Sequence, residues 1–428
     1  MTAFNIKLST IDSFVAEGVK EVNLDDKREF WYTFWRRDKK KTYSIPNFFM
    51  SEALDLFYIA LAVFYADRKV SRSTSWDNWT REFRIYMPVL CVDKWNNLKS
   101  TVEQMLNFLT GDQWQFEFRA REYSYNEKRY QKAKYTFRNS IRTIDTDDFC
   151  MLSGGLDSFI GAIDLLTEGK KPIFVGNYNG GKGVSLYQKE VIKSISEHFQ
   201  YPTNNFYQYY AAPLGGNENT TRSRSLLFFS HAILLASGIG HEIKLCIPEN
   251  GVISLNIPLT VHRSGSLSTR TTHPYYMGLL RTILEQLEIP VKLYNPYQFY
   301  TKGEMMLNCK DWDYLKETYQ LTMSCSHPDH ERWKGAQKPC HCGTCLPCTI
   351  RRAAIYKAGL ADASEYANKT YSDGDAVMNL KSYKVGLARE RDPYLAIQLN
   401  GKITEKHDDY AEVYLRGRKE LSDFLMTI

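Results

Sequence analysis

The sequence predicts an α/β fold in which a central parallel sheet is covered by helices on both faces. Short apolar segments alternate with longer helical patterns from residue 149 onward, which is typical of βαβ units. A glycine turn, Ser153 to Ser158, lies between the first expected strand and its helix. The expected strands are 149–152, 173–175, 206–210 and 243–247, and the expected helices are 159–166, 187–199 and 224–237.

The first 145 residues show the patterns of a folded α+β unit without a nucleotide-binding motif. Helical spacing of apolar residues over 54–65 and 93–109 and strand-like alternation over 83–89 and 114–118 support this reading. The segment 120–139, rich in Arg, Lys, Tyr and Asn, resembles a linker or an extended crossover. We therefore predict three units: an accessory or docking domain (1–145), an α/β domain (146–365) and a C-terminal extension (366–428).

Composition limits the class of protein. The chain has 428 residues, 43% of them hydrophobic, and a net charge of +6, which is too weak to indicate a nucleic-acid coat. We expect a cytoplasmic protein without membrane contact, because no apolar stretch approaches roughly 20 residues and Met1 to Thr10 lacks a secretion signal. Nucleic-acid binding stays open; we interpret the basic run at 36–41 as a solvated loop that phosphates could also contact.

The glycine turn predicts a phosphate site. Paired glycines let backbone amides approach an anion, and the start of the following helix offers free N–H groups. Asp157 would repel bare phosphate, so it indicates bound Mg²⁺ or a capping role. No Gly-Lys-Ser/Thr ending follows, which argues against a Walker-type site. The expected ATP-binding residues are Leu152, Ser153, Gly154, Gly155, Leu156, Asp157 and Ser158.

A cluster of cysteines near residue 345 predicts a bound Zn²⁺. Cys342, Cys345 and Cys348 form C-x2-C-x2-C, with Gly343 supplying a turn, and Cys325 is the expected fourth ligand of a closed tetrahedral site. The competing ligands are Cys340, His327, His330 and His341. An iron-sulfur cluster and a redox disulfide are weaker alternatives, because redox features are lacking and a disulfide leaves two cysteines unexplained.

Several motifs in register resemble the 7-cyano-7-deazaguanine synthase (QueC) family of PP-loop enzymes. The Ser-Gly-Gly-x-Asp-Ser string resembles the PP-loop of enzymes that split ATP into AMP and pyrophosphate. Arg224 to Phe228 resembles the family's Arg-Asn-x-x-Phe helix, with Ser225 in place of asparagine, and Thr301 to Met305 resembles its Ser-Lys-x-Glu turn. The Ser-Cys pair at 324–325 and the run from Cys342 to Arg351 complete the pattern.

The resemblance implies an ATP-dependent ligase that adenylates a 7-deazaguanine carboxylate, with ATP, Mg²⁺ and Zn²⁺ as cofactors. A carboxylate has no leaving group until an acyl adenylate forms, after which an amine can displace AMP. Positive charge would offset the negative charge that grows in this reaction. The catalytic residues implied are Asp157, Lys302, Arg224 and Arg351.

Departures from the family pattern affect the substrate end. The family's Tyr-Pro-Asp segment is absent, with 272–275 as its nearest counterpart, and Glu249 to Gly251 and 263–272 also differ. These features and the extra length at both ends resemble the QatC branch of anti-phage defence systems, which implies a protein partner from the same operon that receives a deazaguanine. Two alternatives remain: a PP-loop tRNA or nucleotide thiolation enzyme, and an inactive nucleotide-sensing interaction module.

Overall fold

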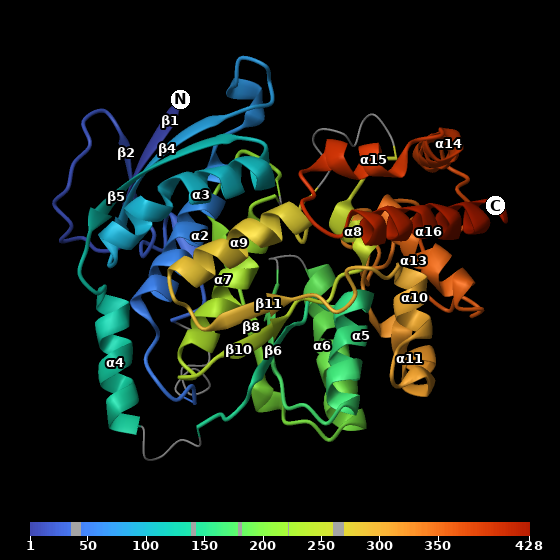
Figure 1. The fold of residues 1–428 in the computed structure, drawn as a ribbon, viewed down its shortest axis with the longest axis horizontal. Helices are drawn as coiled ribbons and strands as arrows, with labels where there is room; N and C mark the ends of the chain where they lie inside the picture. Colours follow the sequence, from blue (N-terminus) through green and yellow to red (C-terminus); the bar gives the residue numbers. More distant parts are fainter. Residues whose placement is uncertain (36–43, 138–142, 179–181, 221, 260–268) are drawn as a thin grey trace.

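The computed structural model describes residues 1–35, 44–137, 143–178, 182–220, 222–259 and 269–428 (Figure 1). The basic run at 36–41 and residues 263–268 of the Ser/Thr/Arg-rich segment lie outside the described residues. No helix in the described ranges is both long enough and apolar enough to span a bilayer.

The central sheet has five strands in the order β11-β10-β6-β7-β8, and every pairing is parallel. The predicted α/β fold is therefore confirmed. The chain runs from β6 outward through β7 and β8, then returns to the other side of β6 for β10 and β11, so strand order reverses between β6 and β10. A crevice at such a reversal is where open α/β sheets bind ligands. The strands are β6 (Asp148–Met151), β7 (Ile173–Asn177), β8 (Phe206–Tyr209), β10 (Ile243–Cys246) and β11 (Val291–Tyr294).

Helices cover both faces of this sheet, because both faces of its buried strands are apolar. Side chains of α5 and α6 pack with Cys150, Phe174 and Cys246 on one face, whereas α7 and α9 pack with Phe149 and Leu245 on the other. The helices and short elements of this part are α5 (Leu156–Thr167), α6 (Lys182–His198), η2 (Thr203–Asn205), α7 (Arg224–Ser237), α8 (Gly251–Leu255), α9 (Pro274–Gln286), α10 (Lys302–Leu307), α11 (Trp312–Thr318), η4 (Tyr319–Leu321), α12 (His330–Trp333) and α13 (Leu346–Lys357).

A second sheet, in the order β2-β1-β4-β5, lies in the N-terminal region, which we define as residues 1–145. All three of its pairings are parallel, which the sequence patterns did not reveal. Its elements are β1 (Thr2–Lys7), β2 (Lys20–Asn23), β3 (Phe30–Tyr32), α2 (Ser51–Lys69), η1 (Arg72–Thr74), β4 (Glu82–Val89), α3 (Val92–Thr110), β5 (Gln113–Ala120) and α4 (Tyr125–Phe137). The reading of 120–139 as a linker is wrong, because α4 forms most of it.

The N-terminal region is tied closely to the central sheet. Strand β3 pairs antiparallel with β9 (Ala211–Pro213), and one apolar cluster continues from α2 and α3 through α7 and α9 to the strands beneath them (Figure 1). Helices α2 and α3 pack on α7 and α9, so this region forms a further layer outside the helices that cover the central sheet. The predicted division at residue 145 stays a prediction.

The C-terminal region, defined as residues 366–428, consists of α14 (Gly374–Ala388), α15 (Pro393–Asn400) and α16 (His407–Leu425). Helix α16 lies beside α8 and α13 (Figure 1). Apolar side chains on one stretch of it, Val413 and Tyr414, pack with Leu255 of α8. Leu421 and Phe424, further along, pack with Leu346 and Ile350 of α13. The helix therefore spans two elements that flank the carboxyl edge of the central sheet.

Candidate functional site

The phosphate loop connects β6 to α5 at the point where strand order reverses. Gly154 has φ of +84°, and a Cβ there would lie 2.7 Å from Gln188 Cγ, so both backbone angle and space require glycine. Ser158 is the anchor of the turn: its hydroxyl accepts from Ser153 N at 3.1 Å and lies 3.0 Å from Ser153 Oγ. The serines predicted to bind phosphate thus also shape the turn itself.

Two neighbouring segments hold the loop from outside. Gln188 of α6 donates from Nε2 to Ser153 O at 3.0 Å, and Met323 N donates to Gly154 O at 2.9 Å. These bonds satisfy the loop's carbonyl groups. Ser153 N and Gly155 N are bonded to serine hydroxyls of the turn, so the N–H groups of Gly154 and of the first turn of α5 are the ones that remain to bind an anion, as at other helix starts.

Asp157 and Lys302, predicted separately from two motifs, meet in the crevice. Lys302 Nζ bonds Asp157 Oδ1, and both side chains are more than nine-tenths buried. Asp157 Oδ2 accepts from Asn250 Nδ2 at 2.7 Å and from Asn250 N at 3.2 Å. Burial alone would raise the pKa of Asp157, but Lys302 and these hydrogen bonds outweigh burial and hold that pKa below its ordinary value. Asp157 is therefore an ionised, buried carboxylate, and no hydrogen bond from its side chain caps α5.

Glu249 is a member of this cluster that sequence reasoning did not place in the site. Burial first, then the charge of Asp157 beside it, raises the pKa of Glu249 well above its ordinary value. The raised pKa of Glu249 and the lowered pKa of Asp157 favour the shared proton of this carboxyl pair on Glu249. The signal was its position: Glu249 and Asn250 follow β10 closely, and β10 is the neighbour of β6 across the strand reversal.

Arg224 begins α7, which packs against β6, β7 and β10. Because helices that join parallel strands run opposite to them, the start of α7 lies at the same carboxyl edge as the phosphate loop. Within the described ranges no acidic or hydrogen-bonding partner is found for the Arg224 guanidinium, which lies 5.4 Å from the ring of Phe228. Burial, together with the charge of Arg68, lowers the pKa of Arg224 to about 10. An anion would relieve this uncompensated charge.

Arg351 is fully buried and already bonded on several sides. It donates to Thr322 Oγ1 at 2.6 Å and to Tyr319 O at 2.8 Å, with longer bonds to Ser324 and Ser364. In this conformation Arg351 holds the chain that leads to Cys325 and does not join the Asp157–Lys302 cluster. Its predicted catalytic role stays a prediction.

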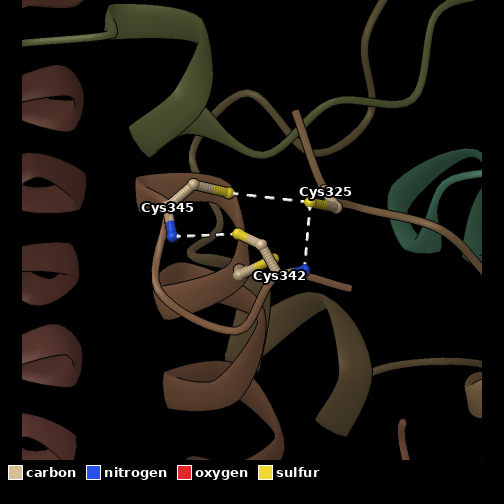
Figure 2. A group of neighbouring side chains, drawn as sticks. Cys325, Cys342 and Cys345 are labelled. Carbon is tan, nitrogen blue, oxygen red and sulfur yellow. Dashed lines mark hydrogen bonds between the residues drawn. The ribbon is translucent and has the colours of Figure 1, made fainter. Parts of the chain in front are cut away.

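The structure brings together the four cysteines predicted to bind zinc. The sulfur atoms of Cys325, Cys342, Cys345 and Cys348 all lie within 4.8 Å of one another. Figure 2 shows three of these residues, Cys325, Cys342 and Cys345. The Cys325–Cys345 and Cys342–Cys348 sulfur pairs are 4.0 and 3.9 Å apart. Four thiolates around one Zn²⁺, with bonds of about 2.3 Å, would lie about 3.8 Å apart, so the arrangement fits this metal.

The backbone around these sulfurs supports negative charge. Cys342 N and His327 N both donate to Cys325 Sγ at 3.3 Å. Cys345 N donates to Cys342 Sγ at the same distance, and Figure 2 shows this bond and the one from Cys342 N. Hydrogen bonding from Cys325 is the main cause that lowers the pKa of Cys342 to about 6. Gly343 has φ of +87°, and a Cβ there would lie 2.1 Å from Asn368 O, which explains the glycine between the first two ligands.

Of the competing ligands, His341 and His327 both lie beside the sulfur cluster, and the side chain of His327 interacts with Cys345. His341 contacts Cys348. Its Nδ1 is 3.9 Å from Cys348 Sγ, and its Nε2 is 3.2 Å from Thr322 O. Cys340, His327 and His330 are not among the metal-holding groups found in the described part of the chain. The cysteine cluster is also linked to the phosphate loop, because Met323, which bonds Gly154, is two residues from Cys325.

Comparison with known proteins adds a distant relationship. No protein-family model matches the chain. The 7-cyano-7-deazaguanine synthase of Saccharolobus solfataricus is 27% identical over 242 residues, and 7-cyano-7-deazaguanine synthase 2 of Sulfurisphaera tokodaii is 27% identical over 244 residues. Each alignment covers 50% of this chain and 46% or 47% of the relative, so the chain spans about half the length of these curated relatives. The predicted resemblance is confirmed as distant homology.

Proposed function

We propose that this protein is an ATP-dependent, AMP-forming ligase that activates a carboxylate by adenylation. The observation that carries the proposal is the buried Asp157–Lys302 pair beside a phosphate loop at the strand reversal. A cation at this place can approach the α-phosphate only if the loop holds the other two phosphates. The distant homology to 7-cyano-7-deazaguanine synthases supports the same class of reaction.

Each residue then has a chemical task. The N–H groups of Gly154 and of the first turn of α5, Leu156 to Ser158, bind the pyrophosphate part of ATP. Lys302 and Arg224 offset the negative charge that grows as the carboxylate oxygen attacks the α-phosphorus. Asp157 keeps Lys302 in place, and its carboxylate is also the group that would hold Mg²⁺, which neutralises phosphate charge when bound.

We assign zinc a structural role in this enzyme. Cys325, Cys342, Cys345 and Cys348 would occupy all four positions of a tetrahedral Zn²⁺, leaving none for substrate. Because Met323 bonds Gly154, fixing Cys325 also fixes one wall of the phosphate loop. Sulfur transfer, as in a thiolation enzyme, would instead require an uncoordinated cysteine among these four.

The proposed carboxylate substrate is a 7-deazaguanine, by analogy with the two relatives, which are 7-cyano-7-deazaguanine synthases. The segment after β10, which contains Glu249, departs from the family pattern. This departure supports a change in the second step, in which an acceptor displaces AMP. We propose that the acceptor is a protein partner in an anti-phage defence system, as the QatC-like sequence features imply. The N-terminal region would be a surface for such a partner.

The test is a single-turnover assay with ATP, Mg²⁺, 7-carboxy-7-deazaguanine and ammonia, the amine that displaces AMP from the acyl adenylate, followed by mass spectrometry. The proposal expects AMP and pyrophosphate in equal amounts, dependent on the carboxylate. The matched control is the same mixture with 7-deazaguanine lacking the carboxyl group, which should give no AMP. Bound but unconverted ATP in every mixture would indicate a nucleotide-sensing module and contradict the proposal. Metal analysis finding no zinc, with four reactive thiols, would favour sulfur transfer.

A further inference from the structure

The turn that carries Lys302 is held by two residues of the C-terminal helix. Glu420 of α16 is 6% exposed, and its Oε1 accepts from Gly303 N at 3.0 Å. Its Oε2 accepts from the Thr301 hydroxyl and lies 3.3 Å from Lys357 Nζ. A buried carboxylate therefore binds the residues on both sides of Lys302.

Arg416, one helical turn before Glu420, holds the other half of the same turn. Thr301 and Glu304 form a capping box at the start of α10, in which each side chain bonds the backbone of the other. Arg416 Nε donates to Glu304 Oε1 at 2.9 Å, and its Nη2 donates to Phe299 O at 2.7 Å. Residues four apart lie on one face of a helix, so a single face of α16 forms hydrogen bonds with both members of the capping box.

Glycine at position 303 is explained by this contact. A Cβ there would lie 2.8 Å from Glu420 Oε2 and 2.8 Å from Lys357 Cδ, which is too close for either atom. The glycine of the Thr-Lys-Gly-Glu turn thus leaves room for the Glu420 carboxylate. The turn at 301–304 and α16 are therefore closely packed at Gly303.

The same helix reaches the other side of Asp157. A Cβ at Gly417 would lie 2.3 Å from Val252 Cγ2, so α16 lies directly on α8. Helix α8 begins immediately after Asn250, which donates two hydrogen bonds to Asp157. Asp157 is therefore approached by two segments, at 250 and at 302, and α16 contacts both.

We propose that α16 is a positioning element of the site, in which Glu420 fixes the turn at 301–304 so that Lys302 reaches Asp157. The positioning itself is a property of the ATP-free protein. Its consequence for catalysis rests on the proposed function, because only a ligase reaction gives Lys302 a charge to offset.

The first experiment measures how accessible the Lys302 amine is to a chemical reagent, and it needs no catalytic turnover. Full-length protein is pulsed with acetic anhydride, and acetylation of Lys302 is followed by mass spectrometry. Glu420→Ala should raise the rate about tenfold, a typical coupling within one hydrogen-bonded network. Asp423→Asn, which removes an exposed carboxylate of the same helix, should leave the rate unchanged. Equal rates in folded Glu420→Ala and in the wild type would overturn the proposal. Should Glu420→Ala not fold, Glu420→Gln replaces it, with a smaller rise expected because the glutamine oxygen can still accept from Gly303 N; a rate equal to that of the wild type would again overturn the proposal.

The second experiment asks whether Glu420 acts through Lys302. In the AMP-forming assay, Glu420→Ala should lower kcat with little change in the KM for ATP, and Glu420→Gln should restore part of the loss. In a Lys302→Met background, Glu420→Ala should cost nothing further, whereas full additivity would contradict positioning. If the wild type forms no AMP, the proposed ligase function fails, and the acetylation result still decides the positioning.

Discussion

Arg224 and Lys302 both begin helices beside the central sheet, and each helix start is held by a carboxylate from outside that sheet. Asp67 of α2, in the N-terminal region, accepts from Ser223 Oγ at 2.6 Å, next to Arg224. Glu420 of α16, in the C-terminal region, accepts from Gly303 N at 3.0 Å, next to Lys302. The two regions at the ends of the chain thus set the positions of the two cations.

The electrostatic states of the two cations differ. Lys302 is paired with Asp157, whereas Arg224 has no acidic partner in the described ranges. The carboxylate near Arg224 is already engaged, because Asp67 also pairs with Arg81 at 2.5 Å. Lys302, which is buried, stabilises its carboxylate partner, whereas Arg224 is only partly buried and its unpaired charge raises the free energy of the empty site. We infer that the Arg224 side is prepared to receive an anion, while Lys302 must share its charge between Asp157 and ATP.

The largest expected difference is that loss of the metal destabilises the segment beside the phosphate loop but not α2 and α7, which lie on the Arg224 side. Structural zinc is worth roughly 10 to 16 kcal/mol in small modules, so Cys345→Ser should lose the metal and a large part of the stability around the phosphate loop. Hydrogen exchange should rise at 319–345 and remain low in α2 and α7. Cys340→Ser is the matched control, because Cys340 lies outside the sulfur cluster. Normal zinc content in Cys345→Ser would contradict the ligand assignment.

Lys302→Met should lower both stability and activity. It leaves Asp157 buried without its cation, which typically costs about 3 to 5 kcal/mol in the free energy of unfolding. AMP formation should fall by about 10² to 10³, as for removal of a charge-stabilising group. Urea unfolding and the single-turnover assay measure the two effects. Lys310→Met, which removes an exposed lysine paired with Glu168, should change neither. Unchanged stability would show that the ion pair is absent in solution.

The contact between α7 and the N-terminal region should be sensitive to acid. His231 of α7 is fully buried, stacks on Tyr209 at 4.9 Å and contacts Phe57 at 5.1 Å, and burial lowers its pKa from 6.5 to about 4. The folded state binds its proton less well than the unfolded state. Stability is therefore complete above pH 6.5 and is lost as the pH falls towards 4, by about 3 kcal/mol.

Replacing the buried histidine should remove this pH dependence. In His231→Phe the free energy of unfolding should decline less between pH 6.5 and 4 than in the wild type. His241→Gln, at an exposed histidine, is the control and should keep the wild-type slope. An unchanged slope in His231→Phe would show that His231 is not a buried neutral group.

Arg224→Met should have the smallest effect on stability. Unlike Lys302→Met, it should weaken ATP binding while leaving the free energy of unfolding nearly unchanged. No buried partner is left behind, so the free energy of unfolding should change by less than about 1 kcal/mol or rise. Binding of ATP should weaken by about 10- to 100-fold, the usual value of a hydrogen bond to a charged group. Calorimetric titration with ATP checks this. A strong loss of stability would show that Arg224 has a structural partner, and the contrast with Lys302 would fail.

Much of the site could be predicted because its signals are local. The phosphate loop follows from six adjacent residues between a strand and a helix, and the cysteine spacing brings three sulfurs together within seven residues. Helix α4 was missed because its polar composition hides the helical period. Glu249 and Asn250 were noticed only as departures from a family pattern, since the strand reversal that brings them to Asp157 is a property of the sheet.

The sequence by itself determined which residues have the chemistry to bind phosphate or metal: a glycine turn, a lysine at a helix start, an arginine and a set of thiols. Tertiary structure alone decided their partners. Asp157 meets Asn250 93 positions away and Lys302 145 positions away, and Gly303 meets Glu420 117 positions away. Periodicity and spacing report only short-range geometry, whereas such contacts are chosen by sheet order and by helix packing across the whole chain.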